Sequence, residues 1–148
     1  MKRTEAGFTL VELMVVVAIL GILVSVSVLR YQEYVVRTQV NRVVFELAGY
    51  KSAVEVNINQ GRSLANSEIG FVPSNLTTAS LGVDVAIFNS DGSGSLRVVI
   101  GRDAHAVMHG LIIQHVRSVS GEWRCQLDTS AVVSDWDPSY RPDSCMAP

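Results

Sequence analysis

Residues 1–29 read MKRTEAGFTLVELMVVVAILGILVSVSVL, and this stretch decides the organisation of the chain. A short leader with Lys2 and Arg3 precedes an apolar run that carries one acid, Glu12. Residues 8–29 number 22, which is enough to cross a hydrocarbon layer of about 30 Å as a helix that rises about 1.5 Å per residue. The basic leader predicts that the amino terminus stays in the cytoplasm.

The order of features differs from that of a cleaved secretory signal. Such a signal carries a small-residue cleavage site after an apolar stretch of about 7 to 15 residues. Here Gly7 precedes the apolar run, and no Ala-x-Ala pattern closes the run before Arg30. Cleavage after Gly7 would therefore remove the basic residues and keep the apolar helix.

The acid in the apolar run needs an explanation. A carboxylate at the centre of a membrane helix costs about 2.5 to 3.5 kcal/mol on insertion scales, so such acids usually have a partner. Cleavage after Gly7 would create a cationic amine on Phe8, four residues before Glu12. This amine could pair with Glu12 of the same chain or of a neighbouring copy, and only the second pairing would set the stagger between helices. The alternative is that Glu12 lies at the headgroup level without a special role.

Length and charge limit the possible functions. A chain of 148 residues suits one domain with a core of reasonable size. The formal net charge is −2, and the sequence shows no basic patch of clustered Lys and Arg of the kind that binds the phosphate backbone. Nucleic acid is therefore not predicted as a partner. No nucleophile, base and orienting acid form a recognisable constellation, and we predict neither an enzyme nor a cofactor.

A helical period continues behind the apolar run. Apolar residues recur at spacings of three, four and seven, and they are Val40, Val43, Val44, Leu47, Val54 and Ile58. This pattern predicts an amphipathic helix over 30–60 that follows the apolar helix without a break and has Gly61 as its carboxyl-terminal cap. Residues 61–82 are rich in Ser, Asn, Thr and Gly, which indicates a connecting loop at the surface.

Two predicted hairpins come after this loop. Residues 83–88 and 96–100 flank one turn, and residues 111–117 and 122–127 flank another. Four short strands after one long helix predict an α+β fold, in which an antiparallel sheet within 83–127 packs on the apolar stripe of the helix.

Three residues between the hairpins are candidates for a metal site. His105 and His109 stand four residues apart, and Asp103 is close to both in sequence. Gly101 and Gly110 leave room for about one helical turn, and zinc needs a third or fourth ligand in place. We therefore predict a solvated connection here and no metal site.

The two cysteines, Cys125 and Cys145, lie in the last 24 residues. In a chain that reaches the far side of a membrane, a disulfide between them is the favoured interpretation. The alternative is two reduced thiols in a cytosolic protein. In the loop-entropy model such a disulfide stabilises the fold by about 3 kcal/mol.

Residues 7–14, GFTLVELM, with the apolar continuation VVVAILGIL at 15–23, closely resemble the prepilin signature of type IV pilins. The resemblance implies that prepilin peptidase cleaves between Gly7 and Phe8 and N-methylates the new amino terminus of Phe8. It also implies that Glu12 pairs with the amine of a neighbouring copy during fibre assembly. Pilins of this type commonly have a proline where Leu29 stands, so the resemblance gives less support here for local unwinding of the helix in the fibre.

The carboxyl-terminal sequence carries a second resemblance. Residues 123–125, WRC, and 136–145, WDPSYRPDSC, resemble the disulfide-bounded loop of type IVa pilins, especially of the pseudomonad kind. The family fold implied is a long N-terminal helix on a four-stranded antiparallel sheet, with a loop bounded by Cys125 and Cys145. Within that loop, Trp136 and Tyr140 are candidates for contact with a surface, although packing on their own domain is the commoner role for such residues.

The resemblance implies a structural subunit that polymerises through its N-terminal helix into extracellular fibres for adhesion and twitching motility. The expected partners are other pilin copies, prepilin peptidase, the inner-membrane assembly machinery, the lipid bilayer before assembly and a host-surface receptor. The expected locations are the inner membrane for the precursor and the extracellular fibre after assembly. The expected segments are a cleaved leader (1–7), a transmembrane and polymerisation helix (8–29), an amphipathic helix (30–60), a loop (61–82), the sheet (83–127) and the disulfide-bounded loop (125–145).

Two other functions stay open at this point. A minor pilin or a type II secretion pseudopilin would share the whole leader. A single-pass membrane-anchored periplasmic domain that binds a small ligand would instead keep an amino terminus at Met1 and form no fibre.

Overall fold

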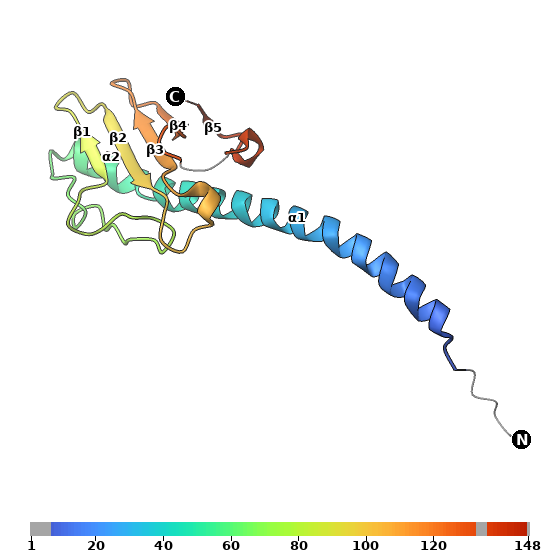
Figure 1. Ribbon diagram of the computed structural model, residues 1–148. Coiled ribbons are helices and arrows are strands. Elements are labelled where there is room, and N and C mark those ends of the chain that lie inside the picture. The colour runs from blue at the N-terminus through green and yellow to red at the C-terminus, as the bar shows by residue number, and fades with distance from the viewer. Residues whose placement is uncertain (1–6, 133–135, 148) are drawn as a thin grey trace, which may run out of the picture. The chain divides into compact units, whose positions relative to one another are not determined.

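The computed structural model describes residues 7–132 and 136–147 (Figure 1). The chain divides into two compact units, residues 1–34 and 35–148, and each is described by itself. The leader predicted at 1–7 lies outside the described residues except for Gly7.

The first unit consists of the early part of helix α1 (Leu10–Ala48). None of the described residues from Gly7 to Gln32 is buried. In the described part of the chain, one helical stretch, Leu10–Asn59, is long and apolar enough to cross a membrane by length and composition. The apolar helix expected from the sequence is therefore present, and none of its described side chains up to Gln32 is buried.

The second unit contains the rest of α1 and helix α2 (Lys51–Asn59). The sequence predicts one unbroken helix, but the structure has a turn at Gly49 and Tyr50. Glycine is a poor helix former, and the amide of Tyr50 bonds the carbonyl of Leu47 at 3.3 Å, which tightens the turn. The hydroxyl of Tyr50 also accepts a hydrogen bond from the amide of Val72 at 3.2 Å, so tertiary contact supports the interruption.

The end of α2 confirms the predicted glycine cap. Gly61 has a φ of +63°. Its amide bonds the carbonyl of Ile58 at 3.1 Å, and the amide of Arg62 bonds the carbonyl of Asn57 at 2.9 Å. These two bonds form a Schellman motif, which satisfies helix carbonyls that lack intrahelical partners.

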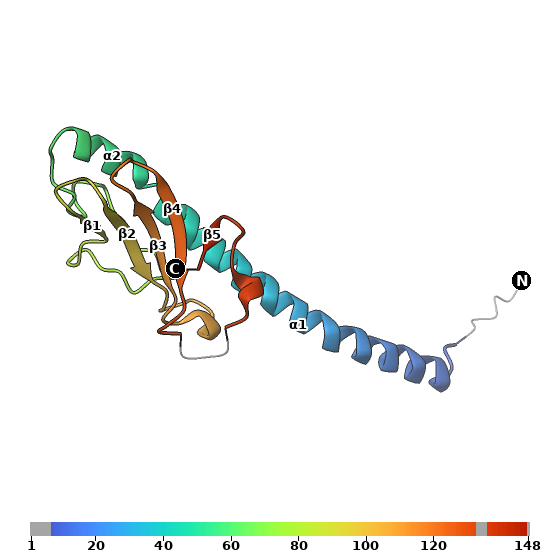
Figure 2. The same ribbon diagram turned by 90° about the horizontal axis from the view of Figure 1, so that it is seen from above.

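The sheet has five strands in the order β1 (Ala86–Phe88), β2 (Gly94–Val99), β3 (Ile112–Arg117), β4 (Trp123–Asp128) and β5 (Cys145–Met146). The first four are antiparallel, as predicted, and β5 is parallel to β4 (Figure 2). The fifth strand was not predicted from the sequence, because two residues carry no strand pattern of their own. The disulfide between Cys125 and Cys145 places them opposite each other.

The first strand is shorter than the sequence predicts. It begins at Ala86, whereas the apolar pattern begins at residue 83. The buried side chain of Asn66 donates to the carbonyl of Val83 at 2.7 Å and accepts from the amide of Val85 at 3.0 Å. This side chain therefore binds backbone groups that would otherwise extend the strand, and it anchors the 61–82 loop.

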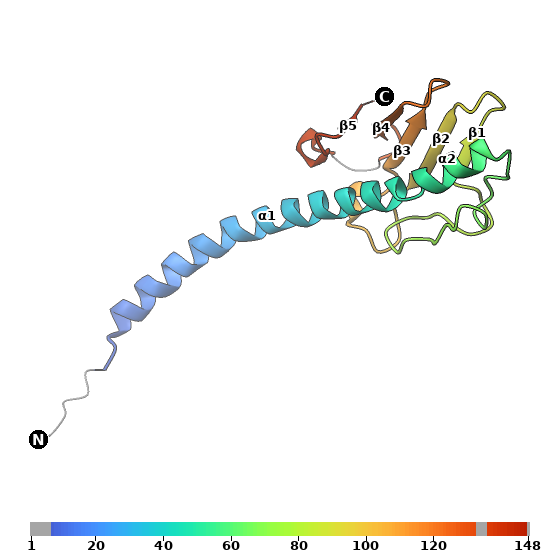
Figure 3. The same ribbon diagram turned by 180° about the vertical axis from the view of Figure 1, so that it is seen from behind.

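The core of the second unit lies between the helices and one face of the sheet (Figure 3). Val40, Val43, Val44, Leu47 and Val54 are buried as predicted, and Ile58 is half-buried against them. The sheet contributes the buried side chains of Leu96, Val98, Ile113 and Leu127. Full burial of one such side chain stabilises a fold by about 1.5 to 3 kcal/mol, so this stripe holds α1 and α2 on the sheet.

Candidate assembly site

The beginning of α1 contains the residues that the sequence places at the assembly site. Phe8 is 84% exposed and Gly7 is exposed, so the predicted cleavage position is accessible in the described residues. The amide and hydroxyl of Thr9 donate to one carboxylate oxygen of Glu12 at 2.9 and 2.7 Å. The amide of Glu12 in turn donates to the hydroxyl of Thr9 at 3.3 Å.

This reciprocal arrangement is a capping box, in which Thr9 and Glu12 satisfy amide donors at the helix start. The prediction of a pairing role for Glu12 overlooked it, although the spacing Thr-x-x-Glu before an apolar run is its signature. Glu12 therefore has a local structural role in the single chain. That role must be separated experimentally from any pairing with another copy.

Behind the capping box, α1 exposes a continuous apolar surface. The large apolar side chains from Leu10 to Leu29 are between 46% and 74% exposed. Soluble monomers rarely expose contiguous apolar patches of more than a few hundred Å², so this surface requires lipid or other protein as its environment. On α1 in the second unit, Phe45 is also 71% exposed, and the sequence analysis did not single it out.

A polar network joins α2 to the sheet. The carboxylate of Glu55 accepts two hydrogen bonds from Arg117, at 2.8 and 3.0 Å, and one from the indole N–H of Trp123 at 2.6 Å. Arg117 also donates to the carbonyl of Gly92 at 2.9 Å. The bonds from Arg117 lower the pKa of Glu55, and the same bonds raise the pKa of Arg117. Both groups therefore stay charged, and their role is to position α2, β3 and the turn before β2.

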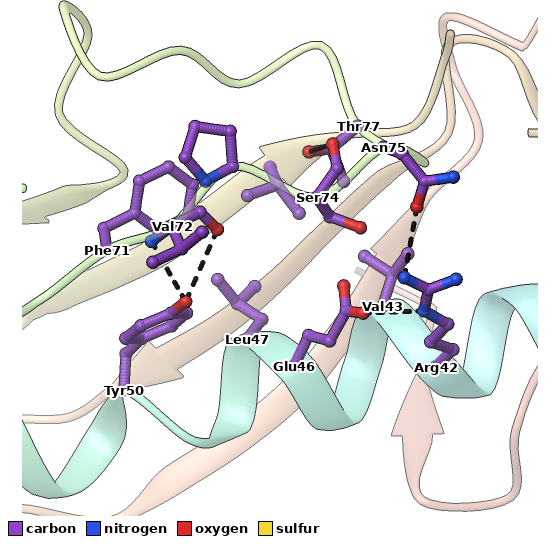
Figure 4. Close-up of a pocket in the computed structure, with 12 residues that line it drawn as sticks. Arg42, Val43, Glu46, Leu47, Tyr50, Phe71, Val72, Ser74, Asn75 and Thr77 are labelled. Atoms are coloured by element: carbon purple, nitrogen blue, oxygen red, sulfur yellow. Dashed lines mark hydrogen bonds and ion pairs between the residues drawn. The ribbon is translucent and has the colours of Figure 1, made fainter. Parts of the chain in front are cut away.

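A groove of about 440 Å³ lies between α1 and residues 71–77 (Figure 4). Part of its polar lining is bonded internally, since Arg42 donates to Glu46 at 2.7 Å and to the amide oxygen of Asn75 at 3.1 Å. The other carboxylate oxygen of Glu46 is buried and has no hydrogen-bond partner among the described residues. The apolar lining includes Leu47 and Phe71. These contacts hold the loop on the helix, and the lining residues provide no paired nucleophile and base.

The two aromatic residues of the disulfide-bounded loop pack against each other. Trp136 and Tyr140 have ring centroids 5.6 Å apart in an edge-to-face arrangement. Both are half-buried and lie against the core of the second unit. The disulfide between Cys125 and Cys145 closes this loop, as predicted. Contact of the two rings with a surface remains a prediction, and their packing favours a structural role.

The candidate metal ligands bond to other groups. The amide of Val107 donates to Nδ1 of His105 at 3.4 Å, and Nε2 of His109 lies 2.9 Å from the carbonyl oxygen of Ala104. A carboxylate oxygen of Asp103 accepts a hydrogen bond from the side-chain amide nitrogen of Asn75 at 3.3 Å. Across residues 7–132 and 136–147, no three His, Cys, Asp or Glu side chains lie together in a group that could hold a metal ion.

Comparisons with known protein sequences give two family matches and several relatives that align over nearly the whole chain. The family model described as pilin, a bacterial filament protein, matches residues 36–146, and the prokaryotic N-terminal methylation motif matches residues 2–28. The chain is 34% identical over 152 residues to a fimbrial protein of Pseudomonas aeruginosa, covering 97% of each chain. It is 32% identical over 161 residues to the type IV major fimbrial protein FimA of Dichelobacter nodosus, covering 98% of this chain and 99% of the relative. It is 30% identical over 157 residues to the type IV major alpha-pilin of Moraxella bovis, covering 97% and 98%.

Proposed function

Because this chain belongs to the pilin family, a family of bacterial filament proteins, we propose that its mature form polymerises through the amino-terminal part of α1 into a type IV pilus. The observation that carries the proposal is a single acid, Glu12, in a 22-residue segment that otherwise holds no charge. Cleavage before Phe8 supplies the missing positive charge, because it creates an amine four residues from that acid. The match to the methylation motif over residues 2–28 supports processing by prepilin peptidase.

In this proposal the precursor waits in the inner membrane and then joins a growing fibre. Moving the apolar helix from lipid into a bundle of identical helices gains little hydrophobic energy, because lipid tails are as apolar as the helix. Packing and charge pairing must therefore supply the specificity of assembly. An amine of the incoming subunit that pairs with Glu12 of a neighbour would set the axial stagger between them.

Mass spectrometry of the mature chain tests the processing step. We expect a chain that begins with N-methylphenylalanine at Phe8. A mature chain that retains residues 1–7 would contradict the proposal and would favour the single-pass membrane protein with a periplasmic ligand-binding domain.

Two substitutions separate the charge of Glu12 from its capping role. Glu12→Gln removes the charge and keeps the capping box, because either glutamate or glutamine can accept the hydrogen bond at the third position of the helix. Thr9→Ala removes the hydroxyl of the capping box and keeps the charge. We expect sheared fibres to be lost in Glu12→Gln and retained in Thr9→Ala, with both precursors present in the membrane at wild-type amounts. Normal fibre yield from Glu12→Gln would contradict the proposed pairing.

Adhesion and twitching motility are the activities we propose for the assembled fibre. The loop between Cys125 and Cys145 is our candidate for surface contact, with Trp136 and Tyr140 as its aromatic residues. Fibres that carry Trp136→Ala or Tyr140→Ala should attach less well than wild-type fibres present in equal amount. Unchanged attachment would remove these two residues from the proposal and leave polymerisation untouched.

A minor pilin is the second candidate function, and Leu29 leaves it open because pilins of this type commonly have a proline at that position. A major subunit should be the most abundant protein in sheared fibres. A trace amount in fibres made mostly of another pilin would identify a minor subunit instead.

A further inference from the structure

His115 in β3 is buried at the contact between the sheet and α1. Its side chain is 2% exposed, and its Nε2 lies 3.1 Å from the carbonyl oxygen of Val44 in α1. This distance fits donation of the Nε2 proton to the carbonyl. The other ring nitrogen, Nδ1, is buried and has no hydrogen-bond partner among the described residues. The neutral ring therefore suits this site, because an Nδ1 proton would have no acceptor.

Among the described residues, Lys51 is the one charged group that acts on His115, and it provides no counter-charge for a protonated ring. Its register partners in β2 and β4 are Leu96 and Cys125, and Cys125 is held in the disulfide. From α1 the ring meets a neutral backbone carbonyl, that of Val44. From α2 the charge of Lys51 reaches it, and this charge repels a cation. The acid of α2, Glu55, is already engaged by Arg117.

We propose that His115 is an acid-sensitive latch, in which protonation in mildly acidic medium weakens the packing of the sheet on the carboxyl-terminal part of α1. The proton would place an unpaired donor and an uncompensated charge in the core, and both are costly there. The latch concerns the second unit alone and does not depend on the proposed assembly mechanism.

The direction of the effect follows from the linkage between protonation and folding. Burial lowers the pKa of His115 below its ordinary value of 6.5, and the charge of Lys51 lowers it further, against the opposing bond to Val44. In the unfolded chain the ring takes up a proton as the pH falls through about 6.5, while the folded chain resists protonation. Below that pH the unfolding equilibrium constant should rise by up to tenfold per pH unit, until the ring titrates in the folded chain.

Denaturant unfolding of the full mature chain in detergent micelles tests the latch, with tryptophan fluorescence as the readout at pH 7.5, 6.5 and 5.5. His115→Gln keeps a donor for the Val44 carbonyl and cannot titrate. His109→Gln is the matched control, since His109 also lies within bonding distance of a backbone carbonyl but is less buried. We expect the unfolding constant of the wild type and of His109→Gln to rise by up to about fivefold between pH 6.5 and 5.5, because half of the unfolded rings are already protonated at pH 6.5. We expect a clearly smaller rise in His115→Gln.

The same pH dependence in His115→Gln as in the wild type would overturn the proposal. A second measurement covers the case in which that variant does not fold. Nuclear magnetic resonance of the His115 ring in the folded wild-type chain should give a titration midpoint below 6.5. A midpoint at or above 6.5 in the folded chain would also overturn the proposal.

Discussion

The side chain of Glu55 joins three elements of the second unit. It lies in α2 and accepts hydrogen bonds from Arg117 in β3 and Trp123 in β4, while Arg117 extends the network to Gly92. The ammonium group of Lys51 also lies 5.6 Å from the centre of the Trp123 ring. The side chain of Arg117 is only 11% exposed and that of Glu55 is 32% exposed, so this ion pair is shielded far better than a typical surface pair.

We predict that Glu55→Gln lowers the free energy of unfolding by about 1.5 to 2 kcal/mol at neutral pH, the lower part of the range for hydrogen bonds to charged groups. The side chain of Glu55 is partly exposed, so water screens the ion pair and reduces the free energy that the substitution removes. Denaturant unfolding measures the effect. Glu122→Gln is the control, because Glu122 and Arg124 are 60% and 59% exposed, and we expect a change below about 0.5 kcal/mol. Equal effects of the two substitutions would contradict this account.

Glu55 should also contribute to the loss of stability of the fold in acid. Arg117 lowers the pKa of Glu55 from its ordinary 4.5, so the folded state holds this proton more weakly than the unfolded state. The stabilisation is complete above about pH 4.5 and is lost as the pH falls through the lower, folded-state pKa. Unfolding measured from pH 6 to pH 3 should therefore show a shallower loss of stability in Glu55→Gln than in the wild type. Parallel curves for the two proteins would contradict the prediction.

At the scale of the elements, α1 is free of proline along its whole length. Gly21, Ser25 and Ser27 interrupt the aliphatic side chains of its apolar part, and the hydroxyl of Ser25 donates to the carbonyl of Ile22 at 2.7 Å. Such bonding to the preceding turn bends helices slightly without breaking them. The helix can therefore stay regular past Leu29, where pilins of this type commonly have a proline.

We predict that Leu29→Pro interrupts α1, at a cost of about 3 kcal/mol in helix stability, because proline removes the amide donor and its ring clashes with the carbonyl of Ser25. Circular dichroism of the full chain in micelles should report less helix. Amide hydrogen exchange should become faster in the turn before residue 29. Leu29→Ala is the control and should change neither signal. A helix that is unaltered in Leu29→Pro would show that the surrounding sequence tolerates the proline.

At the scale of the whole chain, the disulfide between Cys125 and Cys145 ties the carboxyl-terminal segment to strand β4. The cysteines are 20 residues apart in sequence, and both are buried beside the core. Strand β5 pairs with β4 over only two residues, Cys145 and Met146. A ladder of this length is too short to be stable by itself, so the disulfide is what fixes the register of the loop.

We predict that the double substitution Cys125→Ala and Cys145→Ala lowers the free energy of unfolding by about 3 kcal/mol, because the unfolded chain regains the entropy of an open loop. The loop should also become sensitive to proteases between residues 129 and 144. Denaturant unfolding and limited proteolysis measure the two effects. The oxidised wild type is the reference, and a reduced wild type should behave like the double variant. Equal protease resistance in the oxidised wild type and the double variant would contradict the prediction.

The sequence by itself determined the features that depend on local pattern. The apolar run through Leu29 marks the exposed part of α1, the spacing of Val40 to Val54 marks the buried stripe, and Gly61 marks the helix end. Paired apolar runs around turns mark the four antiparallel strands. Each of these features follows from residue periodicity or from the backbone preference of one residue. Periodicity and backbone preference can be recognised in the sequence without knowledge of the tertiary contacts.

Only the tertiary structure decided the features that join distant residues. The interruption at Tyr50 involves the backbone of Val72, the short β1 depends on Asn66, and β5 depends on the disulfide. The Glu55–Arg117 pair spans 62 residues of sequence, and His115 bonds a carbonyl 71 residues away. Burial and hydrogen-bond pairing between distant residues are properties of the packed chain, so no local pattern of residue types predicts them.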